Sequence, residues 1–149
     1  MPDTPPPDDE TIPHSELLYR RVPPDPHGIY VDPTSGETRP TSGAFRSKGP
    51  EPLSVDLASR TTPQECLSGT PGFYLAEVQA GDVRRPDCGC GVVKYPEQGN
   101  KAHALVYGRG KGGALTKSQR EKVAQKARFI VVDEQAVEEA RERAKTEEN

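Results

Sequence analysis

The sequence is short of the residues that build large hydrophobic cores. Leu, Ile, Val and Phe make up 26 of its 149 residues, about 17%, whereas typical globular chains have at least about 20%. Low hydrophobicity produces full disorder mainly when net charge is high, and the net charge here is only −3. The 16 prolines and 14 glycines add many turns. We therefore expect a small folded core whose chain ends do not pack against it.

Long apolar runs and targeting signals are also missing. No apolar stretch approaches the ~18 residues of a transmembrane helix. The acidic, proline-rich start has neither the basic and apolar parts of a signal peptide nor the arginines of a transit peptide. Three cysteines, an odd number, argue against a secreted disulfide framework. The expected location is the cytoplasm, without membrane contact.

The two ends differ in composition from the middle. Residues 1–15 hold four acids and no Lys or Arg, and residues 133–149 hold seven acids against three bases. We expect a disordered, acidic, Pro-rich tail over 1–15, a single domain over 16–132 and an acidic, solvated C-terminal helix or tail over 133–149. Over residues 17–132, Leu, Ile, Val and Phe make up 24 of 116 residues, so their fraction rises to about 21%. The two acidic ends therefore account for much of the low fraction in the whole chain.

Alternation of apolar and polar residues dominates the predicted domain. It predicts strands over 16–22, 53–58, 72–80, 90–95 and 102–107, and a short extended piece lies over 29–31. Capping boxes predict helices that begin after Thr62 and Thr116, the second with an apolar stripe reaching Ile130. These elements predict an α+β fold, with a mostly antiparallel sheet of about five short strands and two or three helices.

Arg20 lies where a core residue is expected. It shares a predicted strand face with Leu18 and Val22. Arginine is rarely buried unless it is paired, and its planar fork suits a carboxylate or a phosphate. Two interpretations remain open: Arg20 pairs with an acid such as Asp56, or it binds an anionic ligand.

Further polar candidates lie in a loop and on two strands. The loop over 39–46 contains Ser42, a glycine and one aromatic, Phe45, and it leads to Ser54. Small residues of this kind let backbone N–H groups approach an anion, although ordinary turns have the same composition. His103 is the only histidine in a predicted regular element, and it is either a structural residue or a general base or ligand.

These residues together define a candidate pocket. The predicted ligand-binding set is Arg20, Ser42, Phe45, Ser54 and His103. The catalytic candidates within it are Arg20, Ser54 and His103, which would have to converge on one concave site.

The cysteines do not form a convincing metal site. Cys88 and Cys90 are one residue apart, and Cys66 lies elsewhere. Structural zinc sites have four ligands, usually with two cysteines spaced by two to four residues. We expect reduced, inert thiols, and we predict no metal and no cofactor.

A basic block runs from Arg109 to Arg128, with seven bases and one acid. Its glycine-rich start precedes a helix N-terminus, which favours anions, but the ending of a phosphate-binding Walker loop is absent. The predicted anion or nucleic-acid surface comprises Arg109, Lys111, Lys117, Arg120, Lys122 and Lys126. The alternatives are a charged, solvated helix, or contact with an acidic partner or the chain's own acidic tails.

Two resemblances add to these predictions. The order Leu18-Tyr19-Arg20-Arg21-Val22, Arg39-Pro40-Thr41-Ser42-Gly43-Ala44-Phe45, Leu53-Ser54-Val55 and Ala102-His103-Ala104-Leu105-Val106 resembles a family of small bacterial proteins. That resemblance covers roughly residues 18–130 and implies no particular activity.

A weaker resemblance is to ADP-ribosyltransferase-like folds of the toxin type. It implies a nicotinamide dinucleotide site in which Arg20 matches the early-strand arginine and Ser54 the later serine. The third motif is missing, because Glu97 lies in a predicted loop and Glu134 begins the acidic tail.

The residues favour a small bacterial, cytoplasmic accessory or binding module with a polar pocket. It is expected to act through a protein partner encoded nearby or a small anionic ligand. One alternative is a nucleotide-handling enzyme of the ADP-ribosyltransferase-like type. The other is a nucleic-acid-binding protein that uses the basic block, although that block lacks interleaved aromatic residues for base stacking.

Overall fold

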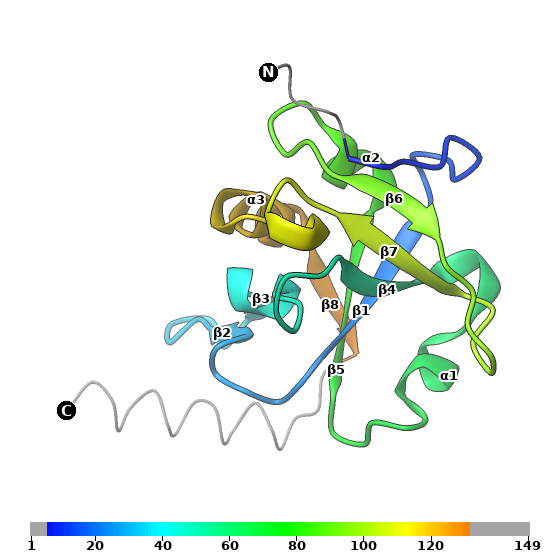
Figure 1. Ribbon diagram of the computed structural model, residues 1–149. Helices are drawn as coiled ribbons and strands as arrows, with labels where there is room; N and C mark the ends of the chain where they lie inside the picture. The colour runs from blue at the N-terminus through cyan, green and yellow to red at the C-terminus, as the bar shows by residue number, and fades with distance from the viewer. Residues whose placement is uncertain (1–5, 132–149) are drawn as a thin grey trace.

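One antiparallel sheet of six strands lies at the centre of the computed structural model, which describes residues 6–131 (Figure 1). The strand order is β6-β7-β4-β1-β5-β8. The strands are β1 Leu17–Val22, β4 Leu53–Leu57, β5 Tyr74–Gln79, β6 Gly91–Lys94, β7 His103–Tyr107 and β8 Arg128–Val131. The predicted α+β fold with a mostly antiparallel sheet is confirmed.

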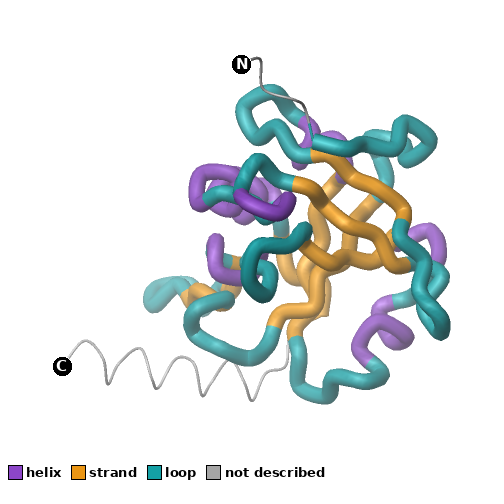
Figure 2. The backbone as a smooth tube through the Cα atoms, viewed as in Figure 1, coloured by secondary structure: helices purple, strands orange, loops and turns teal. Residues whose placement is uncertain are grey.

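Smaller elements surround this sheet (Figure 2). Strands β2 Ile29–Val31 and β3 Thr38–Pro40 form a separate two-stranded sheet. The helices are α1 Pro63–Leu67, α2 Ala80–Arg84 and α3 Lys117–Lys126, and the 3-10 turns are η1 Ser42–Phe45, η2 Ala58–Arg60 and η3 Lys111–Gly113. Within the described residues, no helix has the length and apolar character needed to cross a membrane.

The hydrophobic core lies on one face of the large sheet. Leu18 pairs with Leu57 on β4 and with Val78 on β5, so these three side chains point to the same side. Turn η1 and helix α3 pack over this face and contribute Phe45 and Val123, both almost fully buried. Complete burial of a side chain such as Leu18 or Phe45 contributes about 1.5–3 kcal/mol.

Helix α3 ends earlier than its sequence pattern predicts. Thr116 and Gln119 form the predicted capping box at its start. Its last residue is Lys126, and strand β8 follows and pairs with β5 at the sheet edge. Phe129 packs edge-on against Tyr74, with ring centroids 5.1 Å apart. Pairing with β5 and burial on the core face therefore override the weak helical stripe that predicted a helix as far as Ile130.

An N-terminal strap, residues 6–16, lies against β6 and α2. The amide of Asp9 donates to the Val92 carbonyl at 2.8 Å, and the amide of Gly81 donates to the His14 carbonyl at 2.9 Å. Ile12 is only 2% exposed and belongs to the core. Backbone pairing and one apolar anchor therefore hold residues 6–15, which belong to the predicted acidic tail, against the sheet. The remaining tail prediction, over 1–5, and the C-terminal helix or tail expected over 133–149 lie outside the described residues.

Candidate functional site

Arg20 joins three segments of the chain through its guanidinium group. Its Nε donates to the Ala44 carbonyl at 3.0 Å and its Nη1 to the Ser54 carbonyl at 3.0 Å. Its Nη2 donates to the Arg46 carbonyl at 3.1 Å. The planar fork thus fixes η1 and the loop before β4 onto strand β1.

This cation has no acidic partner among residues 6–131. Asp56, the acid suggested by the sequence, is bonded elsewhere and points to the other face of the sheet. Burial, with a smaller effect from Arg21, lowers the pKa of Arg20 to about 10, so the side chain stays charged at neutral pH. The Nε, Nη1 and Nη2 atoms of Arg20 thus all donate to carbonyl groups of the fold.

The three catalytic candidates do not converge. Arg20 shares the core face with Leu18, whereas His103 pairs with Asp56, on the opposite face of the same sheet. The side chain of Ser54 lies on the His103 face, and only its backbone carbonyl meets Arg20. The arrangement implied by the ADP-ribosyltransferase resemblance is therefore not formed by these residues.

The remaining candidates lie in the 39–46 loop, where they pack in the core or take part in turn η1. Phe45 is 1% exposed and belongs to the core. Ser42 opens turn η1 and is half-buried. The amide of Gly43, one of the N–H groups considered for an anion, donates to the capping hydroxyl of Thr41 at 3.2 Å.

A row of polar residues crosses the second face of the sheet. Each pairs directly with the next on the neighbouring strand, in the order His103, Asp56, Tyr19, Glu77 and Arg128. We call these five residues the polar row. Sequence patterns miss it as a set because it depends on the register of five strands that are far apart in the chain.

Asp56 is the most buried member of the polar row, with 3% exposure. Its carboxylate accepts a hydrogen bond from Asn100 at 2.8 Å and one from the Cys66 thiol at 3.4 Å. Burial, followed by the charge of Asp56, raises the pKa of Cys66 to about 12, so the thiol remains a protonated donor. This cluster attaches α1 to the sheet.

His103 is oriented by the hairpin that precedes β7. Its Nδ1 lies 2.8 Å from the Tyr95 carbonyl, so this nitrogen carries the proton, and it lies 3.1 Å from the Glu97 carboxylate. Nε2 makes no hydrogen bond within the described part of the chain. The residue is 6% exposed. Its Nδ1 contacts the hairpin, and its Nε2 remains a candidate hydrogen-bond acceptor.

At the other end of the polar row, Arg128 and Glu77 form an ion pair. Arg128 donates to the Glu77 carboxylate at 2.6 Å. Burial, followed by the charge of Glu77, raises the pKa of Tyr19. Beside this pair lies a hollow of about 320 Å³, lined by Leu17, Glu77, Val78, Gln79, Asp82, Lys126 and Arg128. Its two acids and two bases offset each other.

The structure divides the basic block into two halves. In the second half, Lys122 lies 3.9 Å from Asp87, Arg128 pairs with Glu77, and Lys126 shares the hollow with Asp82. In the first half, Arg120 donates to the Leu115 carbonyl at 3.0 Å. The remaining cations of the first half, Arg109, Lys111 and Lys117, are exposed.

The fold adds two further cations to that first half. A Cβ on Gly112 would collide with the Pro50 carbonyl, so the loop before β4 packs directly on η3. That loop carries Arg46 and Lys48, both exposed. We call the resulting surface the basic end; it consists of Arg46, Lys48, Arg109, Lys111 and Lys117. None of the five forms an ion pair with a described residue.

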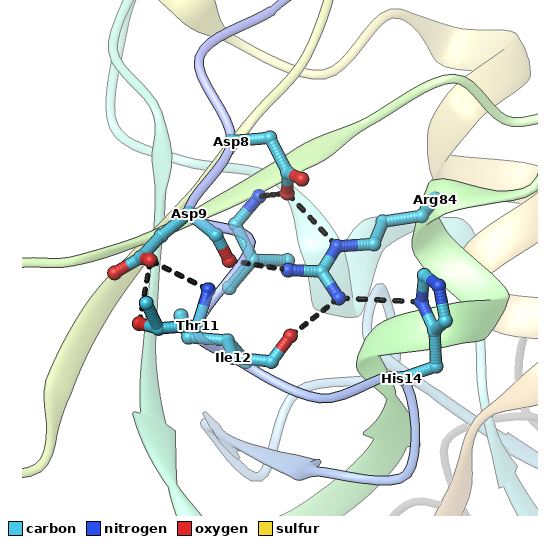
Figure 3. A network of polar contacts seen from close by, with 7 residues as sticks. Asp8, Asp9, Thr11, Ile12, His14 and Arg84 are labelled. Carbon is cyan, nitrogen blue, oxygen red and sulfur yellow. Dashed lines mark hydrogen bonds and ion pairs between the residues drawn. The ribbon is translucent and has the colours of Figure 1, made fainter.

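A second anchored arginine, Arg84, holds the N-terminal strap (Figure 3). Its Nε donates to the Asp8 carboxylate at 2.8 Å, and its other nitrogens donate to the Asp9 and Ile12 carbonyls at 2.8 and 2.7 Å. The side chain is only 9% exposed. The sequence gives no sign of this role, because these partners precede Arg84 by more than 70 residues.

The cysteines remain free thiols, and their sulfurs differ in surroundings. Cys88 and Cys90 bring their sulfurs to 3.7 Å from each other, whereas Cys66 contacts Asp56. Among residues 6–131, no group of three or more His, Cys, Asp or Glu side chains is arranged to hold a metal ion.

No protein-family model matches the chain, and no curated protein or solved structure is significantly similar to it. Function is therefore inferred from geometry and charge.

Proposed function

We propose that this protein is a bacterial, cytoplasmic binding module that recognises an acidic segment of a protein partner through the basic end. The supporting observation is a surface of five exposed cations without intramolecular ion pairs among the described residues. The stretches 44–50 and 108–120, which meet at this surface, contain six cations and no carboxylate. In a protein of net charge −3, such a concentration leaves a local field that attracts anions.

The expected affinity is modest and depends on salt. Exposed ion pairs contribute about 0.2–1 kcal/mol each, so five of them give at most about 5 kcal/mol. Screening at physiological ionic strength acts over about 8 Å and weakens exposed pairs further. The module therefore requires several acids on one partner segment.

An acidic protein segment fits this surface better than a nucleic acid. The large exposed hydrophobic side chains of the described residues are Tyr30 and Tyr95, and neither belongs to the basic end. Bases of a single strand would therefore find no aromatic platform there. Half of the basic block is already offset by acids of the same chain, which shortens the continuous track a phosphate backbone would need.

A binding titration with two probes tests the proposal. One probe is a fluorescently labelled oligoglutamate peptide, and the other is single-stranded DNA of equal charge. Lys111→Glu and Lys117→Glu are compared with Lys101→Glu, an exposed lysine at the opposite end of β7. Each reversal in the basic end should weaken peptide binding by about threefold to tenfold, or roughly 0.7–1.4 kcal/mol, and the control by less than about twofold.

Three outcomes would overturn the proposal. The first is the absence of peptide binding at low salt. The second is an equal loss in all three variants, which would indicate general charge attraction. The third is tighter binding of the DNA probe with the same dependence on Lys111 and Lys117, which would favour the nucleic-acid alternative.

A further inference from the structure

We propose that Cys88 and Cys90 form a redox site that hydrogen peroxide oxidises to a reversible intramolecular disulfide. Their sulfurs lie 3.7 Å apart, and the two residues are 5% and 6% exposed. A disulfide bond is about 2.05 Å long, so closure requires the sulfurs to approach by about 1.7 Å. Rotation of the two cysteine side chains about their Cα–Cβ bonds supplies a movement of this size.

The backbone between α2 and β6 holds the two thiols together. The amides of Cys88 and Gly89 both donate to the Arg85 carbonyl, at 2.9 and 2.7 Å, and the amide of Cys90 donates to the Val83 carbonyl at 2.9 Å. Gly89 has φ +71°, which a residue with a side chain rarely adopts. The left-handed turn therefore brings both cysteines toward the same side.

Hydrogen bonds from a residue of α3 also hold this turn. Gln119 is 4% exposed, and its Nε2 donates to the Cys88 carbonyl at 2.9 Å. Its Oε1 accepts hydrogen bonds from the amides of Arg109 and Thr116 at 2.9 and 3.0 Å. The thiol pair is thus built into the fold, and its burial favours a small oxidant over a bulky one.

The hydrogen bond between the two thiols makes their pKa values unequal. A hydrogen bond from Cys90, with a smaller effect from Lys122, holds the pKa of Cys88 below its ordinary value. The same hydrogen bond and burial raise the pKa of Cys90. Since the thiolate is the nucleophile, Cys88 is the expected attacking sulfur and Cys90 the expected resolving one, an order that the two serine variants test.

The reaction balances in two steps. The Cys88 thiolate attacks one peroxide oxygen, the O–O bond breaks, and hydroxide leaves and takes up a proton as water, which gives a sulfenic acid. The Cys90 sulfur then loses its proton and attacks the Cys88 sulfur. The S–O bond breaks, and a second water leaves. Two thiols are oxidised, one peroxide is reduced, and an external dithiol restores the pair by exchange.

Cys66 provides an internal control. It is as buried as the pair, at 5% exposure, but its sulfur contacts Asp56 and Thr61 instead of a second sulfur. Its raised pKa of about 12 leaves little thiolate at neutral pH. If Cys88 and Cys90 are oxidised faster than Cys66, the difference in rate cannot come from burial, because all three thiols are equally buried.

The test is mild treatment of the full chain with hydrogen peroxide, followed by unfolding, alkylation and peptide mass spectrometry. Of the three thiols, we expect only Cys66 to remain alkylatable, and the peptide containing Cys88 and Cys90 to lose two hydrogens. Dithiothreitol should restore both. The pair should react at least about tenfold faster than Cys66, since each pKa unit changes the thiolate fraction tenfold.

Two variants assign the steps. Cys90→Ser should accumulate a dimedone-reactive sulfenic acid at Cys88, whereas Cys88→Ser should react no faster than Cys66. Cys66→Ser should leave formation of the disulfide unchanged. Equal oxidation of all three cysteines in the unsubstituted chain, direct conversion to sulfinic acids, or a bridge that includes Cys66 would overturn the proposal, whether or not a variant folds.

Discussion

Arg20 and Arg84 donate to the backbone of remote segments, whereas Lys111 and Lys117 make no ion pair within the described residues. The first two hold loops and the strap in place, and removal of either leaves part-buried carbonyl groups without donors. The lysines of the basic end are exposed, and their removal disturbs no internal contact that the structure shows. Positive charge thus serves the fold where it is buried and remains available for a partner where it is exposed.

The two anchored arginines differ from each other as well. Arg20 bonds only to carbonyl oxygens, within the core face of the sheet. Arg84 also pairs with the Asp8 carboxylate and binds a strap at the periphery. Loss of Arg20 should therefore affect the whole domain, and loss of Arg84 mainly one segment.

The largest expected effect is that of Arg20→Ala. The substitution removes three charge-assisted hydrogen bonds and leaves two part-buried carbonyl groups without donors, so the free energy of unfolding should fall by about 3 kcal/mol. Urea denaturation measures this change. Arg21→Ala, on the same strand but the opposite face, is the control and should cost less than about 1 kcal/mol. Similar losses in the two variants would contradict the assigned role of Arg20.

Arg84→Ala should have a smaller and local effect. The strap should loosen at a cost of about 2 kcal/mol. Its release should speed hydrogen exchange of the Val92 amide, which donates to Asp8 at 2.9 Å, and of the Gly81 amide. The neighbouring Arg85→Ala removes only an exposed pair at 3.7 Å and serves as control. Uniform acceleration across the sheet would show that the strap is not a separate unit.

The double variant Lys111→Glu/Lys117→Glu reverses two exposed positive charges of the basic end. Its free energy of unfolding should stay within about 0.5 kcal/mol of the unsubstituted protein, because both side chains are exposed. Thermal unfolding measures this change. A loss as large as that expected for Arg84→Ala would mean that the basic end also supports the fold.

The smallest expected effect depends on pH. Hydrogen bonds from the Thr11 hydroxyl and amide hold the pKa of Asp9 below its ordinary value of 3.8. A depressed pKa contributes stability that is present above the ordinary value and is lost as pH falls through the folded value. Hydrogen exchange in the strap should therefore rise, after correction for intrinsic rates, as pH drops below about 4. Asp9→Asn should reduce this dependence, and an unchanged profile would contradict it.

Much of the fold follows from local patterns. Alternation locates most strands of the sheet, and the capping residues Thr62 and Thr116 locate the starts of α1 and α3. Strand β8 is missed because its four residues become a strand only by pairing with β5, about 50 residues earlier in the chain. Register and strand order depend on such distant pairings, which no local pattern contains.

The candidate site depends even more on distant contacts. The sequence identifies Arg20 as a polar residue on an apolar face, but its carbonyl partners lie 24 to 34 residues later. The charge of the basic block is evident from composition. Its division is not, because Asp87, Asp82 and Glu77 offset one half and Arg46 and Lys48 join the other only after folding.

A nuclear magnetic resonance titration of the isotope-labelled protein with an oligoglutamate peptide at low salt locates the binding surface directly. Amide shifts should change over residues 44–50 and 108–120 and should leave the strap and the polar row unchanged. Addition of salt should reverse these changes. Shifts concentrated on the strap, on the polar row or evenly over the surface would contradict the claim that the basic end is the binding surface.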